Sequence, residues 1–172
     1  MDIKFNDNFT SRGTEYLSKC KKLQIVNMES CTSINDDAIT LLLSKNSECK
    51  SLLNLSRSKI TDKSLLLISE KCPNLQMIYL DNLLDITKEG LFYVLKKCKF
   101  LVIINLFSLP LEFLDPSFLD YSRFSSLVYL KKIEFSGNNF DPLLFKQFCE
   151  KLNQNIPALS IVSNTVLGKR NN

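Results

Sequence analysis

The sequence predicts an α/β protein built as a coil of about seven units, each with one strand, one loop and one helix. Three columns of apolar residues set a period of 26 residues: Ile34, Ile60 and Ile86, then Ile39, Leu65 and Leu91, then Leu42, Ile68 and Val94. Independent columns that keep one period indicate an internal repeat, because chance matches would lose phase. One unit is too small to bury its own apolar faces, so we expect the units to stack, with a parallel sheet on the concave side and helices on the convex side.

Each predicted strand turns two apolar side chains inward, because successive side chains of a strand point to opposite faces. In chain order the inward pairs are Ile3 and Phe5, Val26 and Met28, Leu53 and Leu55, Ile78 and Leu80, Ile104 and Leu106, Ile133 and Phe135, and Leu159 and Ile161. The third pair lies one residue late in the period, and the sixth follows the fifth by 29 residues. These pairs predict seven parallel strands.

The polar residues Asn35, Thr61 and Thr87 stand at one position of the period, directly before a predicted helix. Their side chains are suited to cap that helix by accepting hydrogen bonds from its first amide groups. Asp36 and Asp62 then fall in the first helical turn, where the helix dipole favours negative charge. Capping therefore explains this motif without a functional role.

Two further helices are predicted over residues 12–19, with Tyr16 and Leu17 inward, and over residues 142–152. Residues 107–126 interrupt the series, because proline removes a backbone hydrogen bond from a helix and clashes with the preceding turn. The apolar side chains of this segment either replace the missing helix in the core or form a loop that carries binding specificity. The residues concerned are Pro110, Phe113, Pro116, Phe118, Leu119 and Phe124.

The composition is that of one soluble globular domain, with 172 residues, 45% of them apolar and 23% charged. The net charge of +4 comes from scattered basic residues, which predicts a solvated surface and no nucleic-acid partner. No apolar run reaches the roughly 18 residues of a membrane span, so we expect no membrane insertion. The N-terminal residues lack the layout of a secretion signal, and we expect a cytoplasmic or nuclear protein.

Catalysis and cofactor binding are not expected. The chain has no His, so no Ser-His or Cys-His pair can form, and its four isolated glycines make no phosphate-cradling loop. None of the six cysteines forms a C-x-x-C pair, so the usual zinc spacings are absent and no metal is expected. Cys20, Cys72 and Cys98 share one position of the period, at the end of a helix, where we expect reduced and buried thiols.

Residues 72–98 carry the clearest unit, which begins Cys72-Pro73-Asn74-Leu75 and continues through Ile86-Thr87-Lys88-Glu89-Gly90-Leu91. It resembles the cysteine-containing leucine-rich repeats, whose unit reads roughly C-x-x-L-x-x-L-x-L-x-x-C-x-x-I-T-D-x-G-L. Residues 20–106 follow this signature well, and the remainder follows it loosely. The resemblance implies a leucine-rich-repeat solenoid, which we expect to cover residues 1–167, with a polar tail over residues 168–172.

In that family the repeats bind proteins, chiefly as the substrate-recognition part of F-box ubiquitin-ligase subunits. The resemblance therefore implies a protein partner and a substrate-recognition or adaptor role, with ubiquitin-ligase components as partners. An F-box would precede the repeats, and only two residues precede the first predicted strand, so we expect the repeat half of such a subunit or a free-standing relative. The competing interpretation is a structural or assembly subunit held in a larger complex through an open sheet edge at the first strand.

The outward side chains of the strands predict a binding surface. One outward row is mostly apolar and reads Asp2, Ile25, Leu52, Met77, Ile103, Lys132 and Ala158. A contiguous exposed apolar patch usually marks an interaction site. The predicted partner-binding residues are the four apolar members of this row and three neighbours, namely Ile25, Leu52, Met77, Tyr79, Ile103, Asn105 and Phe107. The alternative is that these side chains pack internally, under the edge of the helices or under residues 107–126.

Overall fold

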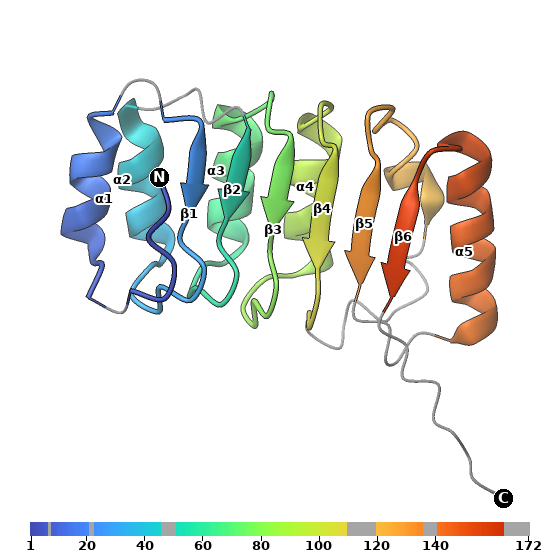
Figure 1. The fold of residues 1–172 in the computed structure, drawn as a ribbon, viewed down its shortest axis with the longest axis horizontal. Coiled ribbons are helices and arrows are strands. Elements are labelled where there is room, and N and C mark those ends of the chain that lie inside the picture. The colour runs from blue at the N-terminus through green and yellow to red at the C-terminus, as the bar shows by residue number, and fades with distance from the viewer. Residues whose placement is uncertain (7, 21–22, 46–50, 110–119, 136–140, 164–172) are drawn as a thin grey trace, which may run out of the picture.

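Strands and helical segments alternate along the chain. Figure 1 shows the computed structural model, which describes residues 1–6, 8–20, 23–45, 51–109, 120–135 and 141–163. In order, the elements are α1 (Ser11–Ser18), β1 (Ile25–Asn27), α2 (Asp36–Lys45), β2 (Leu52–Asn54), α3 (Asp62–Lys71), β3 (Met77–Tyr79), α4 (Lys88–Lys97), β4 (Ile103–Leu106), the 3-10 helix η2 (Tyr121–Arg123), β5 (Lys132–Phe135), α5 (Pro142–Asn155) and β6 (Ser160–Ser163).

The strands form one parallel sheet in which β1 to β6 lie side by side in the order of the chain. Parallel neighbours need a crossover connection, and the helices supply it on one face of the sheet, behind the strands in Figure 1. The opposite face is not covered by a helix of the described chain. The predicted α/β architecture, a parallel sheet with helices on one side, is confirmed.

The predicted count of seven strands is not confirmed, because the described residues contain six. The expected first strand is an extended segment that makes a single parallel bridge, from Asp2 to Asn27 and not to Ile25. Phe5, which was predicted to point inward, is 65% exposed. Its backbone is already in the left-handed region, with φ of 58°, so the segment turns away where the prediction continued a strand.

The last strand is displaced by two residues from its predicted alignment. A spacing of 26 residues would place Ala158 beside Lys132, but the sheet pairs Lys132 with Ser160 and Ile133 with Ile161. The helix before this strand explains the difference. It has 14 residues, whereas α2, α3 and α4 have 10 each, so the connection uses more of the chain.

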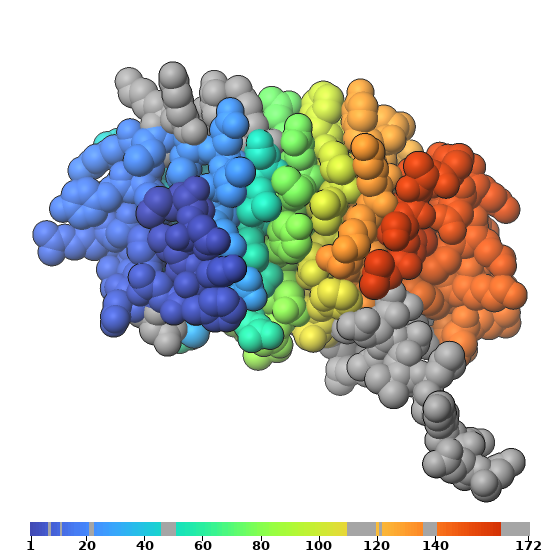
Figure 2. All heavy atoms as spheres, viewed as in Figure 1, coloured from blue at the N-terminus to red at the C-terminus, as the bar shows by residue number. Residues whose placement is uncertain are grey.

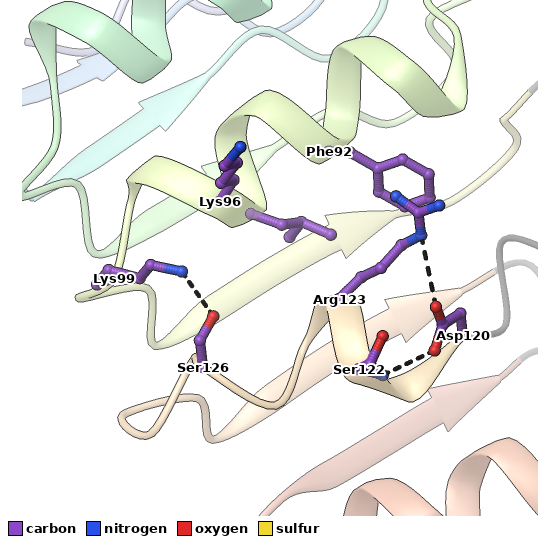
Figure 3. Close-up of a pocket in the computed structure, with 8 residues that line it drawn as sticks. Phe92, Lys96, Lys99, Asp120, Ser122, Arg123 and Ser126 are labelled. Atoms are coloured by element: carbon purple, nitrogen blue, oxygen red, sulfur yellow. Dashed lines mark hydrogen bonds and ion pairs between the residues drawn. The ribbon is translucent and has the colours of Figure 1, made fainter.

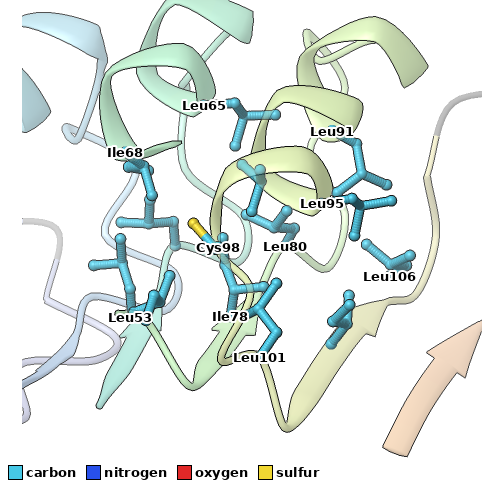
Figure 4. Packing of buried hydrophobic residues seen from close by; sticks show 14 of the residues in the cluster. Leu53, Leu65, Ile68, Ile78, Leu80, Leu91, Leu95, Cys98, Leu101 and Leu106 are labelled. Carbon is cyan, nitrogen blue, oxygen red and sulfur yellow. The ribbon is translucent and has the colours of Figure 1, made fainter. Parts of the chain in front are cut away.

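The core lies between the sheet and the helices. Figure 4 shows the inward side chains of β2 to β4 meeting Leu65 and Ile68 of α3 and Leu91 and Leu95 of α4. The predicted inward pairs of the five central strands are each at most 2% exposed: Val26, Met28, Leu53, Leu55, Ile78, Leu80, Ile104, Leu106, Ile133 and Phe135. Burial of one such side chain stabilises the fold by about 1.5–3 kcal/mol.

Two of the three cysteines that share a position of the period are buried as predicted. The Cys98 thiol donates to the Cys72 carbonyl oxygen over 3.4 Å, and burial raises the pKa of Cys98 to about 12. At α1 the prediction is wrong in part: Cys20 and Tyr16 are exposed, and of the two residues predicted to point inward, Leu17 is the buried one. As the outermost helix of the row, α1 is flanked by α2 on one side only (Figure 1).

A left-handed residue recurs at the carboxyl end of successive strands, a feature that the sequence analysis missed. These residues have φ between 52° and 62° and are Phe5, Ser30, Arg57, Asn82 and Ser108. The amide of each of the first four donates to a carbonyl oxygen of the next unit: Phe5 to Glu29 (2.7 Å), Ser30 to Ser56 (2.9 Å), Arg57 to Asp81 (2.8 Å) and Asn82 to Phe107 (2.9 Å). The turns are therefore hydrogen-bonded in series, like the strands before them.

The predicted helix caps are present. Asn35 accepts from the Ala38 amide (3.0 Å), Thr61 accepts from Lys63 (3.2 Å), and Thr87 accepts from Gly90 (3.4 Å). These contacts satisfy amide groups that have no partner inside the helix.

The acidic residues of the first helical turns do more than the predicted dipole interaction. The Asp36 carboxylate accepts from the Thr61 amide (3.0 Å) and hydroxyl (2.7 Å), and Asp62 does the same with Thr87 (2.8 and 2.6 Å). Each carboxylate thus joins the start of one helix to the cap of the next. Hydrogen bonds to a charged acceptor are stronger than neutral ones, so these contacts set the spacing of α2, α3 and α4.

The contact between Asp62 and Thr87 favours glycine at position 90, because a Cβ at this position would overlap the Asp62 carboxylate. Glycine in a helix interior normally costs about 0.5–1 kcal/mol relative to alanine. We predict the reverse here: Gly90→Ala should lower the free energy of unfolding by about 1–3 kcal/mol through steric conflict. Urea unfolding measures this. In an Asp62→Ala background the same change should become neutral or stabilising, and a loss of equal size in both backgrounds would contradict the steric cause.

Asp36 gives a pH-dependent prediction. Burial raises its pKa, but hydrogen bonds from Ser64 and Thr61 outweigh burial, so the pKa lies below the ordinary value of 3.8. A carboxyl whose pKa is lowered by folding stabilises the fold above its unfolded pKa, and this contribution is lost as pH falls through the folded pKa. Asp36→Asn should therefore cost about 1 kcal/mol at pH 7, with the difference from wild type shrinking below pH 3.8.

The measurement is urea unfolding of both proteins at neutral and acidic pH. Asp37→Asn is the matched control, since Asp37 lies exposed in the same helical turn. Equal pH dependence for wild type and Asp36→Asn would contradict the role given to the Asp36 hydrogen bonds.

Candidate protein-binding surface

The sheet face opposite the helices carries an apolar row, defined as Ile25, Leu52, Met77 and Ile103. The strand pairing places these residues side by side, from Ile25 to Leu52, from Leu52 to Met77 and from Met77 to Ile103. Adjacent strands lie about 4.8 Å apart, so the row spans about 14 Å across β1 to β4. It ends at Lys132, which pairs with Ile103 on β5. The predicted alignment is correct for these strands, including Leu52 on the strand that runs one residue late.

The apolar row is partly open to solvent. Ile25 is 48% exposed, and Leu52, Met77 and Ile103 are half-buried. Figure 2 views this face and shows the strands β1 to β6 side by side across the molecule, with the N-terminal residues beside β1. Each side chain of the row therefore keeps part of its surface exposed and has the rest buried against neighbouring residues. The exposed part is open to partner contact, and the buried part packs internally.

A polar row runs beside the apolar one and consists of Asn27, Asn54, Tyr79, Asn105 and Glu134, in the order of the strand pairing. The three asparagine side chains accept hydrogen bonds from the amides two residues later, over 3.1–3.3 Å. They thereby hold the start of the turn that follows each strand.

Asn105 is more deeply buried than the other predicted binding residues. It is 8% exposed, and its side-chain amide donates to a Glu134 carboxylate oxygen over 3.1 Å. Its hydrogen-bonding groups serve the sheet, whereas Tyr79 and Phe107 are half-buried and keep part of their surface exposed.

Charged groups border the apolar row in pairs. Lys132 contacts Glu134 over 2.7 Å, and this hydrogen bond raises the pKa of Lys132. Arg57 lies 3.9 Å from Asp81, beyond the polar row, three residues after Asn54 and two residues after Tyr79. Burial raises the pKa of Asp81, and the nearby Arg57 charge partly offsets that effect. The Glu29 charge also raises the pKa of Asp81, so two acidic side chains lie close together beyond the polar row.

The described part of the chain contains no group of three or more His, Cys, Asp or Glu side chains that could hold a metal ion. None of its helices has the length and apolar character needed to cross a bilayer.

Of the predicted aromatic segment, Phe124 is fully buried, which supports a core role for that residue. Pro110, Phe113, Pro116, Phe118 and Leu119 lie outside the described residues.

Two neighbouring isoleucines test whether the apolar row is a surface. Ile103 faces outward and is half-buried, whereas Ile104 is 0% exposed on the opposite face. We predict that Ile103→Ser lowers the free energy of unfolding by about 1 kcal/mol and Ile104→Ser by more than about 3 kcal/mol, because only the second buries a hydroxyl and leaves a cavity. Chemical unfolding measures both. Similar large losses would mean that the row belongs to the core.

Comparisons with known proteins support the fold. No protein-family model and no curated protein sequence matches this chain. Among solved structures, the tropomodulin C-terminal domain of Caenorhabditis elegans superposes with a TM-score of 0.65 at 16% identity, covering 84% of this chain and 92% of that one. At this identity the likeness concerns the arrangement of strands and helices alone. The chain therefore has a leucine-rich-repeat-like fold, which agrees with the fold that the resemblance of residues 20–106 implied.

Proposed function

We propose that this chain is a non-catalytic protein-binding module that uses the open face of its sheet. The observation that carries the proposal is the strand pairing, which makes one continuous, partly exposed apolar row out of residues that lie about 26 positions apart. Tyr79 and Phe107 extend the contact area on one side. Isolated exposed apolar residues are ordinary on a protein surface, but a contiguous row on an uncovered face usually marks an interaction site.

The expected energy of such a contact is modest for each side chain. Burial against a partner would contribute on the order of 1–2 kcal/mol per apolar residue before the cost of association. Four residues with two aromatic neighbours can therefore support a specific complex of moderate affinity. A partner would present a complementary apolar strip, since the row offers one apolar side chain from each of four successive strands.

A finer version of this proposal is a substrate-recognition or adaptor role in ubiquitin ligation, in the cytoplasm or nucleus. Its support is the resemblance of residues 20–106 to the cysteine-containing leucine-rich repeats. The competing proposal is a structural subunit held through the sheet edge at the first predicted strand. Residues 1–5 form that edge and donate hydrogen bonds from Ile3 to Asn27 (2.9 Å) and from Phe5 to Glu29 (2.7 Å). They make a single parallel bridge, so they offer a partner only a short edge, and this proposal has less support.

The test is site-specific photo-crosslinking in cells of the native source, followed by mass spectrometry. A photoreactive amino acid at Met77 should capture a protein that the same amino acid at Leu66 does not, because Leu66 is exposed on the helix side. Changing Ile25, Met77 and Ile103 together to serine should abolish that capture with the fold intact, as judged by circular dichroism. Recovery of ubiquitin-ligase components would favour the adaptor role.

Two results would count against the proposal. Equal capture from Met77 and Leu66 would mean that the apolar row is not the contact surface. Unfolding of the triple variant would mean that the row is part of the core.

A further inference from the structure

A hollow of about 300 Å³ opens on the helix side of the molecule, between the end of α4 and the η2 turn. Figure 3 shows its lining: Lys96 and Lys99 come from the end of α4 and the residues after it, and Asp120, Ser122 and Arg123 lie on and beside η2. Among the described residues between β4 and β5, the helical element is the three-residue η2, whereas α2, α3 and α4 have ten residues each.

The hollow is electropositive. Its lining holds three basic side chains and one acidic side chain, a balance of +3 − 1 = +2. The acidic group, Asp120, accepts from the Ser122 amide over 3.0 Å. Hydrogen bonding from Ser122 is the main cause that lowers the pKa of Asp120, and the charges of Arg123 and Lys151 add to it. Asp120 is therefore ionised at neutral pH and still leaves an excess of positive charge.

The guanidinium of Arg123 is held in place by two contacts. Its central carbon lies 3.7 Å from the centre of the Phe92 ring, a cation–π arrangement. Its Nε atom lies 3.9 Å from an Asp120 oxygen, which is an ion pair beyond hydrogen-bond distance. Since a guanidinium carries five N–H donors in a planar fork, this pair leaves donors for a ligand.

A second donor group stands across the hollow. The Lys99 ammonium donates to the Ser126 hydroxyl over 2.6 Å, which places the ammonium at the rim and uses one of its three donors. Lys96 adds a further ammonium from the same end of α4. An arginine fork, lysine ammonium groups and serine hydroxyls around one hollow are the groups that bind phosphate oxygens.

We propose that this hollow binds a phosphate-bearing anion, with Arg123 and Lys99 as its main ligands. The volume exceeds that of a phosphate group, so the phosphate can belong to a small metabolite or to a phosphorylated side chain. The site is open to water, so binding is weak to moderate and falls as ionic strength rises. It lies on the face opposite the apolar row and is independent of the protein-binding proposal.

The test is a titration of the 15N-labelled chain with inorganic phosphate at constant ionic strength, followed by NMR. The Arg123 side-chain Nε–H and the Ser122 and Ser126 amides should shift together and saturate. Arg123→Gln and Lys99→Gln should each weaken the apparent affinity by at least about tenfold, because each removes charge-assisted hydrogen bonds. Lys97→Gln is the matched control: it removes the same charge from α4 at a position outside the hollow and should leave the affinity unchanged.

Phosphoserine and ribose 5-phosphate, added in parallel, distinguish a phosphorylated side chain from a small sugar phosphate by which of the two binds more tightly. Shifts that rise linearly without saturation would overturn the proposal. A loss in Lys97→Gln equal to that in Arg123→Gln would also overturn it, because it would show attraction to surface charge in general.

Discussion

The alignment of one unit with the next is the constraint on which the rest of this structure depends. Each of strands β1 to β6 pairs in parallel with its neighbour in the chain, so a residue in one unit lies beside its counterpart 25 to 29 positions away. The buried columns, the hydrogen-bonded turns and the apolar row are all consequences of this alignment. In a strand, a shift of one residue would exchange the buried and exposed faces, so the apolar pattern strongly opposes such a shift.

Polar contacts reinforce this alignment outside the sheet. On the helix side, Asp36 and Asp62 each join one helix to the cap of the next. At the ends of the strands, left-handed residues donate to the following unit. Because stacked units contact mainly their neighbours, contacts of this kind determine how firmly each pair of units is coupled. The Asp–Thr contact is interrupted at α4, where Lys88 stands in the position of the aspartate.

The two candidate binding regions arise from opposite properties of the same architecture. The apolar row depends on regularity, since four successive units contribute one side chain each at the same level of the sheet. The electropositive hollow depends on a single junction, since its lining comes from α4, η2 and the residues next to them. The surface on one face is therefore shared between units, whereas the hollow on the other is particular to one junction.

The sequence alone determined the order of strands and helices, the inward residues of the central strands, the helix caps and the alignment of Ile25, Leu52, Met77 and Ile103. The inward residues follow from local apolar spacing, which reports on which face of a strand or helix is buried, and the alignment follows from the repeat period. The caps follow from the polar residue directly before each helix. The tertiary structure decided the two ends of the sheet, the exposure of Phe5 and Cys20, the engagement of Asn105 with Glu134, and the hollow beside Arg123. Each of these depends on the position of a unit at the end of the row, on one particular pair of side chains or on the length of one connection. The period of an apolar pattern reports only which positions of successive units are neighbours.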